Sequence, residues 1–286
     1  MRVTLYMHAK KGGVVEFSYQ FCRTSYRTLK SMNFIVQAST DRGNTKEKNQ
    51  DSLSVKVVNT SIGKMVFAVL CDGMGGLEKG EVASATIVNA YNKWLINELP
   101  LLCNTGISDG DIRRAWVGIA DEYNEKIKSY GKSHGVSLGT TLTAMLITSN
   151  RYYIINIGDT RAYEIDKEVT ILTRDQTLVA REIDHGRLTK EEAAVDSRRN
   201  VLLQCIGASD RIYPDMFFGV TKKDTVYMLC SDGFRHEISQ EEIYAYMQPS
   251  QMSDPNRMKA NMDMLIQLNK DRLERDNISV IAVRTY

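Results

Sequence analysis

The apolar segment Met65–Cys71 places the strongest constraint on the fold, because it runs directly into Asp72-Gly73-Met74-Gly75-Gly76. A run of this kind is typical of a strand that is buried on both faces. The glycines allow the backbone to turn sharply and to approach a ligand closely. An isolated Asp-Gly pair would indicate an ordinary hairpin turn. Here the pattern recurs after a second apolar run, at Cys230-Ser231-Asp232-Gly233, so we interpret it as a site.

Carboxylates that follow or precede strands can supply oxygen ligands, which Mg²⁺ and Mn²⁺ prefer. Five aspartates occupy such positions or a tight turn: Asp51, Asp72, Asp159, Asp232 and Asp276. Grouped carboxylates repel one another unless they share a proton or a cation. Their convergence at one end of a sheet would therefore predict a metal centre, and an all-oxygen site fits two divalent ions about 3.5–4 Å apart. The four histidines are scattered and no Cys-rich spacing is present, which disfavours zinc.

Charge and cysteine usage exclude several classes of protein. Residues 1–31 carry six Lys or Arg and one Glu, a net of +5, so the other 255 residues carry −3 (+2 minus +5). That balance argues against a nucleic-acid partner. The five cysteines form no C-x-x-C pair, and we expect buried, reduced thiols in a cytoplasmic protein. No apolar run reaches the roughly 18 residues of a membrane span, and no signal peptide is visible.

The chain is predicted to contain one catalytic domain, residues 32–286, preceded by a basic N-terminal extension, residues 1–31. Two explanations of the extension stay open: a flexible, disordered segment, or translation from upstream of a true start at Met32. We favour the second, because a strand pattern begins at Asn33, immediately after that methionine. No internal repeat, low-complexity tract or linker interrupts residues 32–286.

Hydrophobic periodicity predicts many short strands and four longer helices. The expected strands are residues 33–38, 53–57, 65–71, 141–148, 152–157, 161–165, 169–172, 201–206, 216–220, 225–230 and 278–283. The expected helices are residues 81–99, a helix capped by Ser108 or Asp109 that runs to Tyr130, residues 241–247 capped by Ser239, and residues 257–275. The polar segment 175–199, with a capped turn at Thr189, looks like an insertion over the sheet edge.

These elements predict an α+β fold. The helices come in two pairs and do not alternate with single strands, so the economical arrangement is two stacked, mostly antiparallel sheets with helices on both outer faces. A Rossmann sheet is disfavoured, since no G-x-G-x-x-G opens a helix.

Seven short motifs, in this order, carry a resemblance to the bacterial metal-dependent (type 2C, PPM) serine/threonine protein phosphatases. They are Thr40-Asp41-Arg42-Gly43 with Asn49-Gln50-Asp51-Ser52, Asp72-Gly73-Met74-Gly75-Gly76, Gly139-Thr140-Thr141, Gly158-Asp159-Thr160-Arg161, Arg199-Asn200-Val201-Leu202, Ser231-Asp232-Gly233 and Asp276-Asn277. The resemblance covers about residues 33–284. It implies a four-layer αββα sandwich with a Mn²⁺ or Mg²⁺ pair. It further implies hydrolysis of phosphoserine and phosphothreonine by a water that bridges the two ions.

The resemblance also implies roles for individual residues. Asp72 would bridge both metal ions, and the Gly73 carbonyl would bind the second. Asp232 and Asp276 would complete the first ion, while Asp51 would hold the side of the second. Asp159, with Asp232, matches the position where bacterial members take a third ion.

This chain departs from the family pattern at several positions. Gln50 replaces a frequent Glu, and Lys46 stands where many members use an Arg to hold the substrate phosphate. Lysine lacks the bidentate guanidinium fork. Lys46 is therefore a candidate phosphate ligand that would bind phosphate more weakly than an arginine at this position. Arg42 could substitute for it, although we favour a solvated loop arginine. Met74 leaves no evident general acid, and Asp196-Ser197 replaces a His-Pro in segment 175–199, which matches the family's flap beside the site.

The sequence therefore predicts a cytoplasmic, monomeric phosphoprotein phosphatase that acts in signalling on the substrates of a cognate Ser/Thr kinase, with neither nucleic acid nor membrane as a partner. Two alternative functions share parts of this pattern. A non-catalytic binding module should have lost metal-binding Asp residues, and none is lost here. A phosphatase for small phosphorylated molecules would use the same metal chemistry, so only a comparison of substrates separates it.

Overall fold

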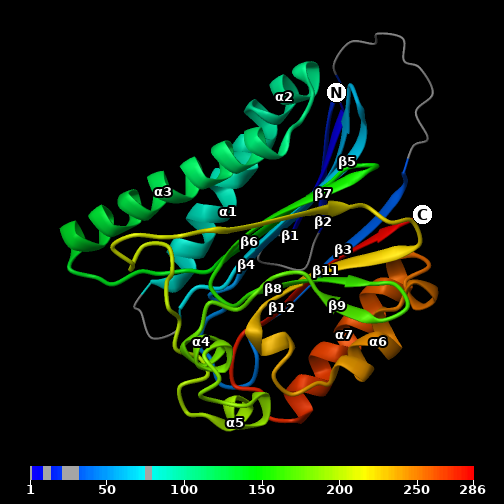
Figure 1. Ribbon diagram of the computed structural model, residues 1–286. Coiled ribbons are helices and arrows are strands. Elements are labelled where there is room, and N and C mark those ends of the chain that lie inside the picture. Colours follow the sequence, from blue (N-terminus) through cyan, green and yellow to red (C-terminus); the bar gives the residue numbers. More distant parts are fainter. Residues whose placement is uncertain (1, 9–13, 21–31, 75–78) are drawn as a thin grey trace.

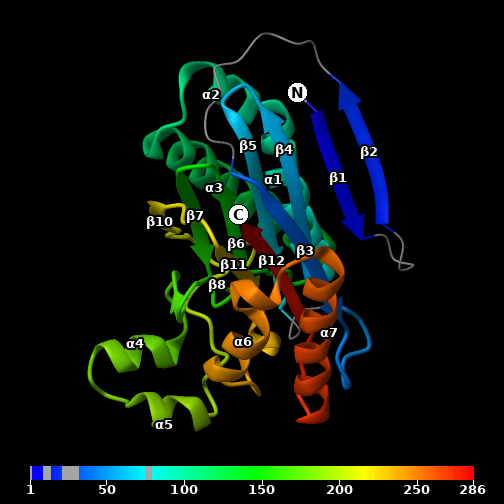
Figure 2. The same ribbon diagram turned by 90° about the vertical axis from the view of Figure 1, so that its right-hand side faces the viewer.

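Two stacked β-sheets lie between helices on both outer faces in the computed structural model (Figure 1). The structure describes residues 2–8, 14–20, 32–74 and 79–286. Helices α1 and α3 cover one sheet, and α6 and α7 cover the other (Figures 1 and 2). The α+β four-layer sandwich predicted from the sequence is confirmed.

The first sheet has seven antiparallel strands in the order β10-β7-β6-β5-β4-β1-β2. Their bounds are β10 Asp215–Val220, β7 Arg151–Ile157, β6 Leu142–Ile147, β5 Gly63–Cys71, β4 Ser52–Thr60, β1 Arg2–His8 and β2 Val14–Gln20. The second sheet has the order β3-β12-β11-β8-β9. Its strands are β3 Phe34–Asp41, β12 Ile278–Thr285, β11 Thr225–Cys230, β8 Arg161–Ile165 and β9 Val169–Ile171.

The helices occupy the connections between these strands. Their bounds are α1 Gly80–Asn97, α2 Leu99–Thr105, α3 Asp109–His134, α4 Leu178–Asp184, α5 Lys190–Val195, α6 Gln240–Met247 and α7 Pro255–Asp271. Short 3₁₀ turns are η1 Asp232–Phe234 and η2 Pro249–Gln251. Ser108 caps α3, and Ser239 and Thr189 form capping boxes at α6 and α5, which satisfies N–H groups that a helix start leaves unpaired.

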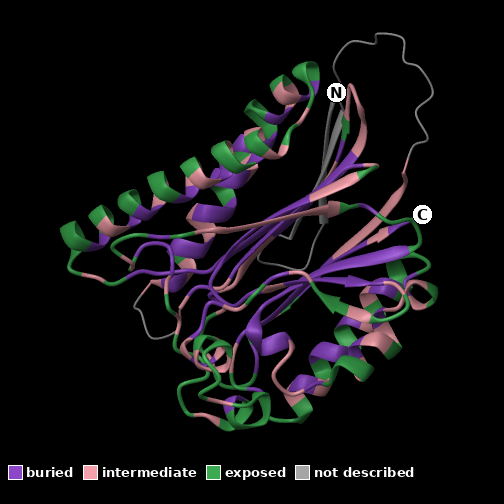
Figure 3. Ribbon diagram, viewed as in Figure 1, coloured by how far each residue is buried: buried purple, intermediate pink, exposed green. Residues whose placement is uncertain are grey.

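Strand β5 is buried on both faces, as its unbroken apolar sequence predicts. Phe67 packs against Trp94 of α1 and Trp116 of α3, with ring centroids 5.8 and 5.9 Å away. The alternate residue Ala68 belongs to the cluster between the sheets, together with Leu229 of β11. A third cluster, rich in methionine, lies under α6 and α7. The purple sheets between largely green helix faces in Figure 3 show the same layering.

Four details differ from the sequence prediction. Residues 201–206 form no strand; only isolated bridges occur there, from Leu202 to Thr177 and from Ile206 to Thr140. The predicted helix 81–99 ends at Asn97, and the unpredicted α2 follows it. Helix α7 ends at Asp271 rather than Arg275. The structure also describes β1 and β2 within residues 1–31, where no strand was predicted.

Strands β1 and β2 form a hairpin that extends the first sheet. Residues Arg2–Tyr6 pair with β4 in the register Arg2↔Asn59 to Tyr6↔Val55. The predicted boundary at residue 32, with the extension outside the catalytic domain, stays a proposal. Residues 1, 9–13 and 21–31 of that extension, which include Cys22, lie outside the described residues.

Candidate metal centre

Asp72 stands where β5 ends, and a network of backbone contacts fixes its turn. Its N–H donates to Thr141 Oγ1 at 2.9 Å, and its carbonyl accepts from Thr140 Oγ1 at 2.9 Å. A β-carbon at Gly73 would lie 2.4 Å from the Gly80 carbonyl oxygen and 2.6 Å from that of Gln50. Only glycine fits this crossing, so the Gly73 carbonyl and the Asp72 carboxylate are held side by side at the strand end.

The second sheet contributes the equivalent pair from β11 and β12. Asp232 follows β11, while Asp276 precedes β12. A β-carbon at Gly233 would lie 2.3 Å from the Asn277 carbonyl oxygen, so these two turns are also in direct contact. Strands β4 and β5 pair as Ser52↔Cys71, and β11 and β12 pair as Cys230↔Val280. Four aspartates therefore lie at the same end of the two sheets.

Asp159 lies in the turn that joins β7 of the first sheet to β8 of the second. It lines one cavity of about 210 Å³ with four other predicted site residues, Lys46, Asp72, Asp232 and Asp276. The remaining lining residues are Met74, Thr141, Asn200 and Leu202. Asp51 does not line this cavity, but it lies close enough to Asp232 and Asp276 for their charges to raise its pKa.

The loop that carries Lys46 is clamped to the start of β12 by Asn277. The buried amide of Asn277 donates to the carbonyls of Arg42 at 2.9 Å and Lys48 at 3.1 Å, and its oxygen accepts from Gln50 N–H at 2.8 Å. Lys46 Nζ consequently lies 2.9 Å from Asp276 Oδ1, at the edge of the cavity. The Arg42 side chain is exposed, in line with a solvated arginine.

Buried carboxylates that repel one another dominate the electrostatics. Burial, together with the charges of Asp232 and Asp276, raises the pKa of Asp51 to about 7, although the nearby Ser279 and Ser231 hydroxyls act in the opposite direction. Burial and four neighbouring carboxylates raise the pKa of Asp72 well above its usual range. Burial and the charge of Asp232 raise the pKa of Asp159 to about 7.

The donor set fits divalent metal ions. Both carboxylate oxygens of Asp51 and Oδ1 of Asp232 are buried and accept no hydrogen bond of ordinary geometry. Such oxygens are costly to bury unless a cation or a proton meets them. Across residues 32–74 and 79–286, however, no three His, Cys, Asp or Glu side chains are gathered closely enough to form a finished ligand set.

Two cationic side chains reach the aspartates. Lys46 pairs with Asp276, and the buried Arg235 donates from Nη2 to the Asp159 carbonyl at 3.0 Å and approaches its carboxylate at 3.5 Å. For Lys46, burial lowers the pKa, but the contact with Asp276 and the charges of Asp72 and Asp232 raise it further, so the net shift is upward. Both cations partly offset the repulsion within the group.

A buried chain of ion pairs connects the site to the start of the flap segment, residues 175–199. Asp175 accepts two hydrogen bonds from Arg161, at 2.8 and 2.7 Å, and its Oδ2 lies 3.4 Å from Arg235 Nη2. Arg235 also contacts Asp159, as described above. The position of the flap is thereby coupled to that of Asp159, beside the metal-type carboxylates.

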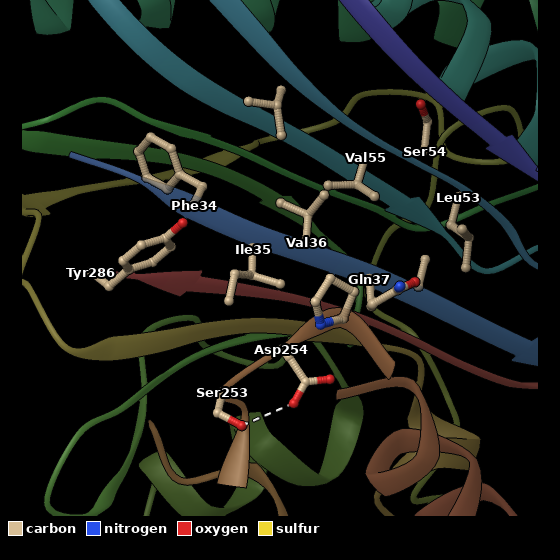
Figure 4. Close-up of a pocket in the computed structure, with 13 residues that line it drawn as sticks. Phe34, Ile35, Val36, Gln37, Leu53, Ser54, Val55, Ser253, Asp254 and Tyr286 are labelled. Carbon is tan, nitrogen blue, oxygen red and sulfur yellow. Dashed lines mark hydrogen bonds between the residues drawn. The ribbon is translucent and has the colours of Figure 1, made fainter. Parts of the chain in front are cut away.

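A separate groove lies between β3 and β4, away from this site (Figure 4). Its volume is about 460 Å³, and apolar side chains such as Phe34, Val36, Leu53 and Val55 line most of it. Its one carboxylate, Asp254, caps helix α7 by accepting from Asn256 and Arg257 N–H groups. The groove therefore lacks the oxygen ligands that the strand-end cavity gathers.

Comparison with known proteins identifies the family of this chain. The model of the family described as protein phosphatase 2C matches residues 40–267. The chain belongs to the protein phosphatase 2C family. It is 31% identical over 211 residues to protein phosphatase PhpP of Streptococcus pneumoniae, which covers 73% of this chain and 82% of PhpP.

A second relative is the serine/threonine protein phosphatase PstP of Mycobacterium tuberculosis. It is 30% identical over 246 residues, and the match covers 86% of this chain but 44% of PstP, so the chain spans less than half of that relative. The solved PstP catalytic domain in complex with two manganese ions superposes with a TM-score of 0.70 at 27% identity, covering 89% of this chain and 99% of that one. The predicted family is thereby confirmed.

Several residues that shape this type 2C site were not assigned roles from the sequence. His236 Nδ1 lies 3.2 Å from Glu274 Oε2, and its Nε2 lies 3.7 Å from Asp232 Oδ2. Arg235 and Asp175 meet across 60 residues of sequence. The only local signal was the position of Arg235 and His236 immediately after Ser231-Asp232-Gly233. Their partners could be identified only once the fold was known.

Proposed function

We propose that this chain hydrolyses phosphoserine and phosphothreonine in proteins, at the cavity lined by Asp72, Asp159, Asp232 and Asp276. The observation that carries the proposal is the grouping of five aspartates, four of which line this cavity, with orphaned buried oxygens on Asp51 and Asp232, in a type 2C chain. Asp51, Asp72, the Gly73 carbonyl, Asp232 and Asp276 would hold two Mn²⁺ or Mg²⁺ ions. When bound, this pair supplies an activated water and neutralises phosphate charge. Asp159 would add a ligand for a third ion.

The protein's own groups position the substrate. Lys46 Nζ, on the rim of the cavity, would hold a phosphate oxygen, in exchange for part of its contact with Asp276. Asn277 keeps the Lys46 loop in place, and the flap would cover the bound phosphoresidue from the Asp175 side. Met74 offers no proton, so no side-chain acid is assigned to the leaving alcohol.

We further propose a cytoplasmic monomer that works in signalling, opposite a cognate Ser/Thr kinase. The four described cysteines are free and buried, which supports a reducing compartment. Of the described helices, none is long and apolar enough to cross a bilayer. Fractionation of the native cells and light scattering of the purified protein test location and oligomeric state.

The deciding experiment is hydrolysis of a phosphothreonine peptide by the purified chain, with and without Mn²⁺. We expect turnover that requires Mn²⁺ or Mg²⁺, is abolished by a chelator and is insensitive to iodoacetamide, because the cysteines at positions 71, 103, 205 and 230 are buried. Faster turnover of small phosphorylated metabolites than of any phosphopeptide would favour the metabolite phosphatase. Inactivation by iodoacetamide with metal present would indicate cysteine chemistry instead.

A further inference from the structure

Leu273, just after helix α7, has an unusual backbone. Its φ is +68°, in the left-handed region that glycine adopts without cost and leucine does not. Leu273 N–H donates to the Lys270 carbonyl at 3.1 Å, and Glu274 N–H donates to that of Asn269 at 3.0 Å. This is a helix-terminating turn in which the left-handed position is usually glycine. Leucine is therefore locally unfavourable here.

Burial of the side chain does not offset this unfavourable backbone conformation, since Leu273 is 77% exposed. Its neighbours fix the turn instead. Glu274 is 5% exposed, and its Oε1 accepts from the N–H groups of Arg275 at 2.6 Å and Asp276 at 2.9 Å. An unfavourable conformation that the surroundings impose, with an apolar side chain presented to solvent, is a feature that commonly accompanies a functional surface.

Leu273 lies beside the metal-centre cavity. It lines a cavity of about 280 Å³ that shares Lys46, Asn200 and Asp276 with the metal-centre cavity. The two cavities are therefore adjacent. This volume lies at the lower limit of small-molecule pockets, roughly 300–1,000 Å³, so it suits one or two side chains of a longer chain rather than a whole ligand.

The charge of the same cavity adds a second preference. Arg199 and Arg275 both line it. Arg199 Nη1 donates to the Ala194 carbonyl at 3.1 Å, and neither guanidinium forms a salt bridge with any residue that the structure describes. Both are available to an incoming carboxylate.

We propose that Leu273 is a specificity-determining residue, on which an apolar side chain next to the substrate phosphoresidue packs, while an acidic side chain of the same segment meets Arg275 and Arg199. The inference rests on the proposed function and names its substrate class: phosphoprotein segments with both an apolar and an acidic residue near the phosphorylation site. Leu273 contributes to recognition of the flanking chain and not to phosphate chemistry.

The test uses phosphothreonine peptides in which leucine or serine, and aspartate or asparagine, are placed at each of the two positions on either side of the phosphothreonine. The full-length chain with Mn²⁺ should prefer the best leucine peptide over its serine partner by about 10-fold in kcat/KM, the size expected for one apolar contact. Leu273→Asn should reduce that ratio to below about 3-fold. Asparagine adopts left-handed backbone readily, so this variant should melt no lower than the wild type.

Leu273→Gly serves as the second variant, and it should lose the preference in the same way while its Tm stays equal or rises. Leu101→Asn is the matched control, because Leu101 is 65% exposed on α2, at the opposite end of the molecule from the flap helices α4 and α5 (Figure 1). It should leave the ratio unchanged. Arg275→Gln should lower the aspartate-over-asparagine ratio by about 3-fold or more and leave the leucine preference intact.

Two outcomes would overturn the inference. One is an active wild type with equal kcat/KM for leucine and serine peptides at all four positions. The other is a leucine preference that Leu273→Asn leaves in place. Absence of Mn²⁺-dependent turnover with every peptide would instead refute the proposed function, so the two failures are distinguishable.

Discussion

Replacing Asp51 by asparagine should stabilise the metal-free protein while it weakens metal binding. Both oxygens of Asp51 are buried, and burial raises the pKa of its carboxyl from 3.8 to about 7. The folded protein therefore binds the Asp51 proton more tightly than the unfolded chain does. Stability contributed by this group falls as pH rises from about 4 to about 7, and the full penalty applies above pH 7.

The size of the effect follows from that shift. Each pKa unit corresponds to about 1.4 kcal/mol, so the ionised Asp51 costs about 4 kcal/mol at pH 8 and about 1.5 kcal/mol at pH 5. Asparagine keeps the shape and removes the charge, but its amide must still be buried. We expect Asp51→Asn to raise the free energy of unfolding by about 2–4 kcal/mol at pH 8, equivalent to about 5–10 °C in Tm, with little change at pH 5.

Thermal unfolding in chelator at pH 5 and pH 8, repeated with Mn²⁺, measures this directly. Mn²⁺ should raise the Tm of the wild type much more than that of the variant, because a ligand stabilises only the state that binds it. A Tm difference that is the same at both pH values, or a variant that is less stable than the wild type in chelator at pH 8, would refute the reasoning.

Three further predictions concern the metal ligands and Lys46, the Asn277 clamp, and residues 1–31. Asp72→Ala should lower kcat by several powers of ten, since the carboxylate would hold both ions. Lys46→Ala should cost about 1–3 kcal/mol of substrate binding, seen mainly in KM, and Lys46→Arg should be at least as active as the wild type. Steady-state measurements of kcat and KM test these expectations, and near-normal turnover of Asp72→Ala at saturating Mn²⁺ would contradict the metal assignment. Asn277→Ala should lower Tm by about 5–10 °C, because it removes the three hydrogen bonds of a buried side chain. An unchanged melting curve would mean that the clamp on the Lys46 loop is dispensable. A chain that starts at Met32 should keep its phosphatase activity, because β1 pairs with Val55–Asn59 of β4 and leaves the Asp51 end of that strand free; loss of most activity in a peptide assay would make residues 1–31 part of the working domain.

Local patterns were sufficient to predict much of this molecule. The apolar run before Asp72 became β5, and the similar run before Asp232 became β11, because strands buried on both faces are encoded by consecutive residues. The aspartates converge because antiparallel pairing brings the end of one strand beside the start of the next. Glycines at 73 and 233 marked close backbone crossings that the structure contains.

Contacts between distant residues were not predictable in this way. The mostly apolar residues 201–206 were mistaken for a strand, whereas only Leu202 and Ile206 make isolated bridges there. The contact of His236 with Glu274 joins residues that have no shared local pattern. The left-handed turn at Leu273 was not predictable either, because the residue type gives no indication of it. Such features depend on which segments the fold places together.

The placement of the aspartates on two different sheets has a consequence for the order of folding. Asp51 and Asp72 border strands of the first sheet, and Asp232 and Asp276 border strands of the second. Neither sheet alone presents the full set, so high-affinity metal uptake should begin only after the two sheets have docked. Bound metal ions would then link the two sheets, and this link would form after the folding transition state. Interactions of that kind slow unfolding and leave the folding rate almost unchanged.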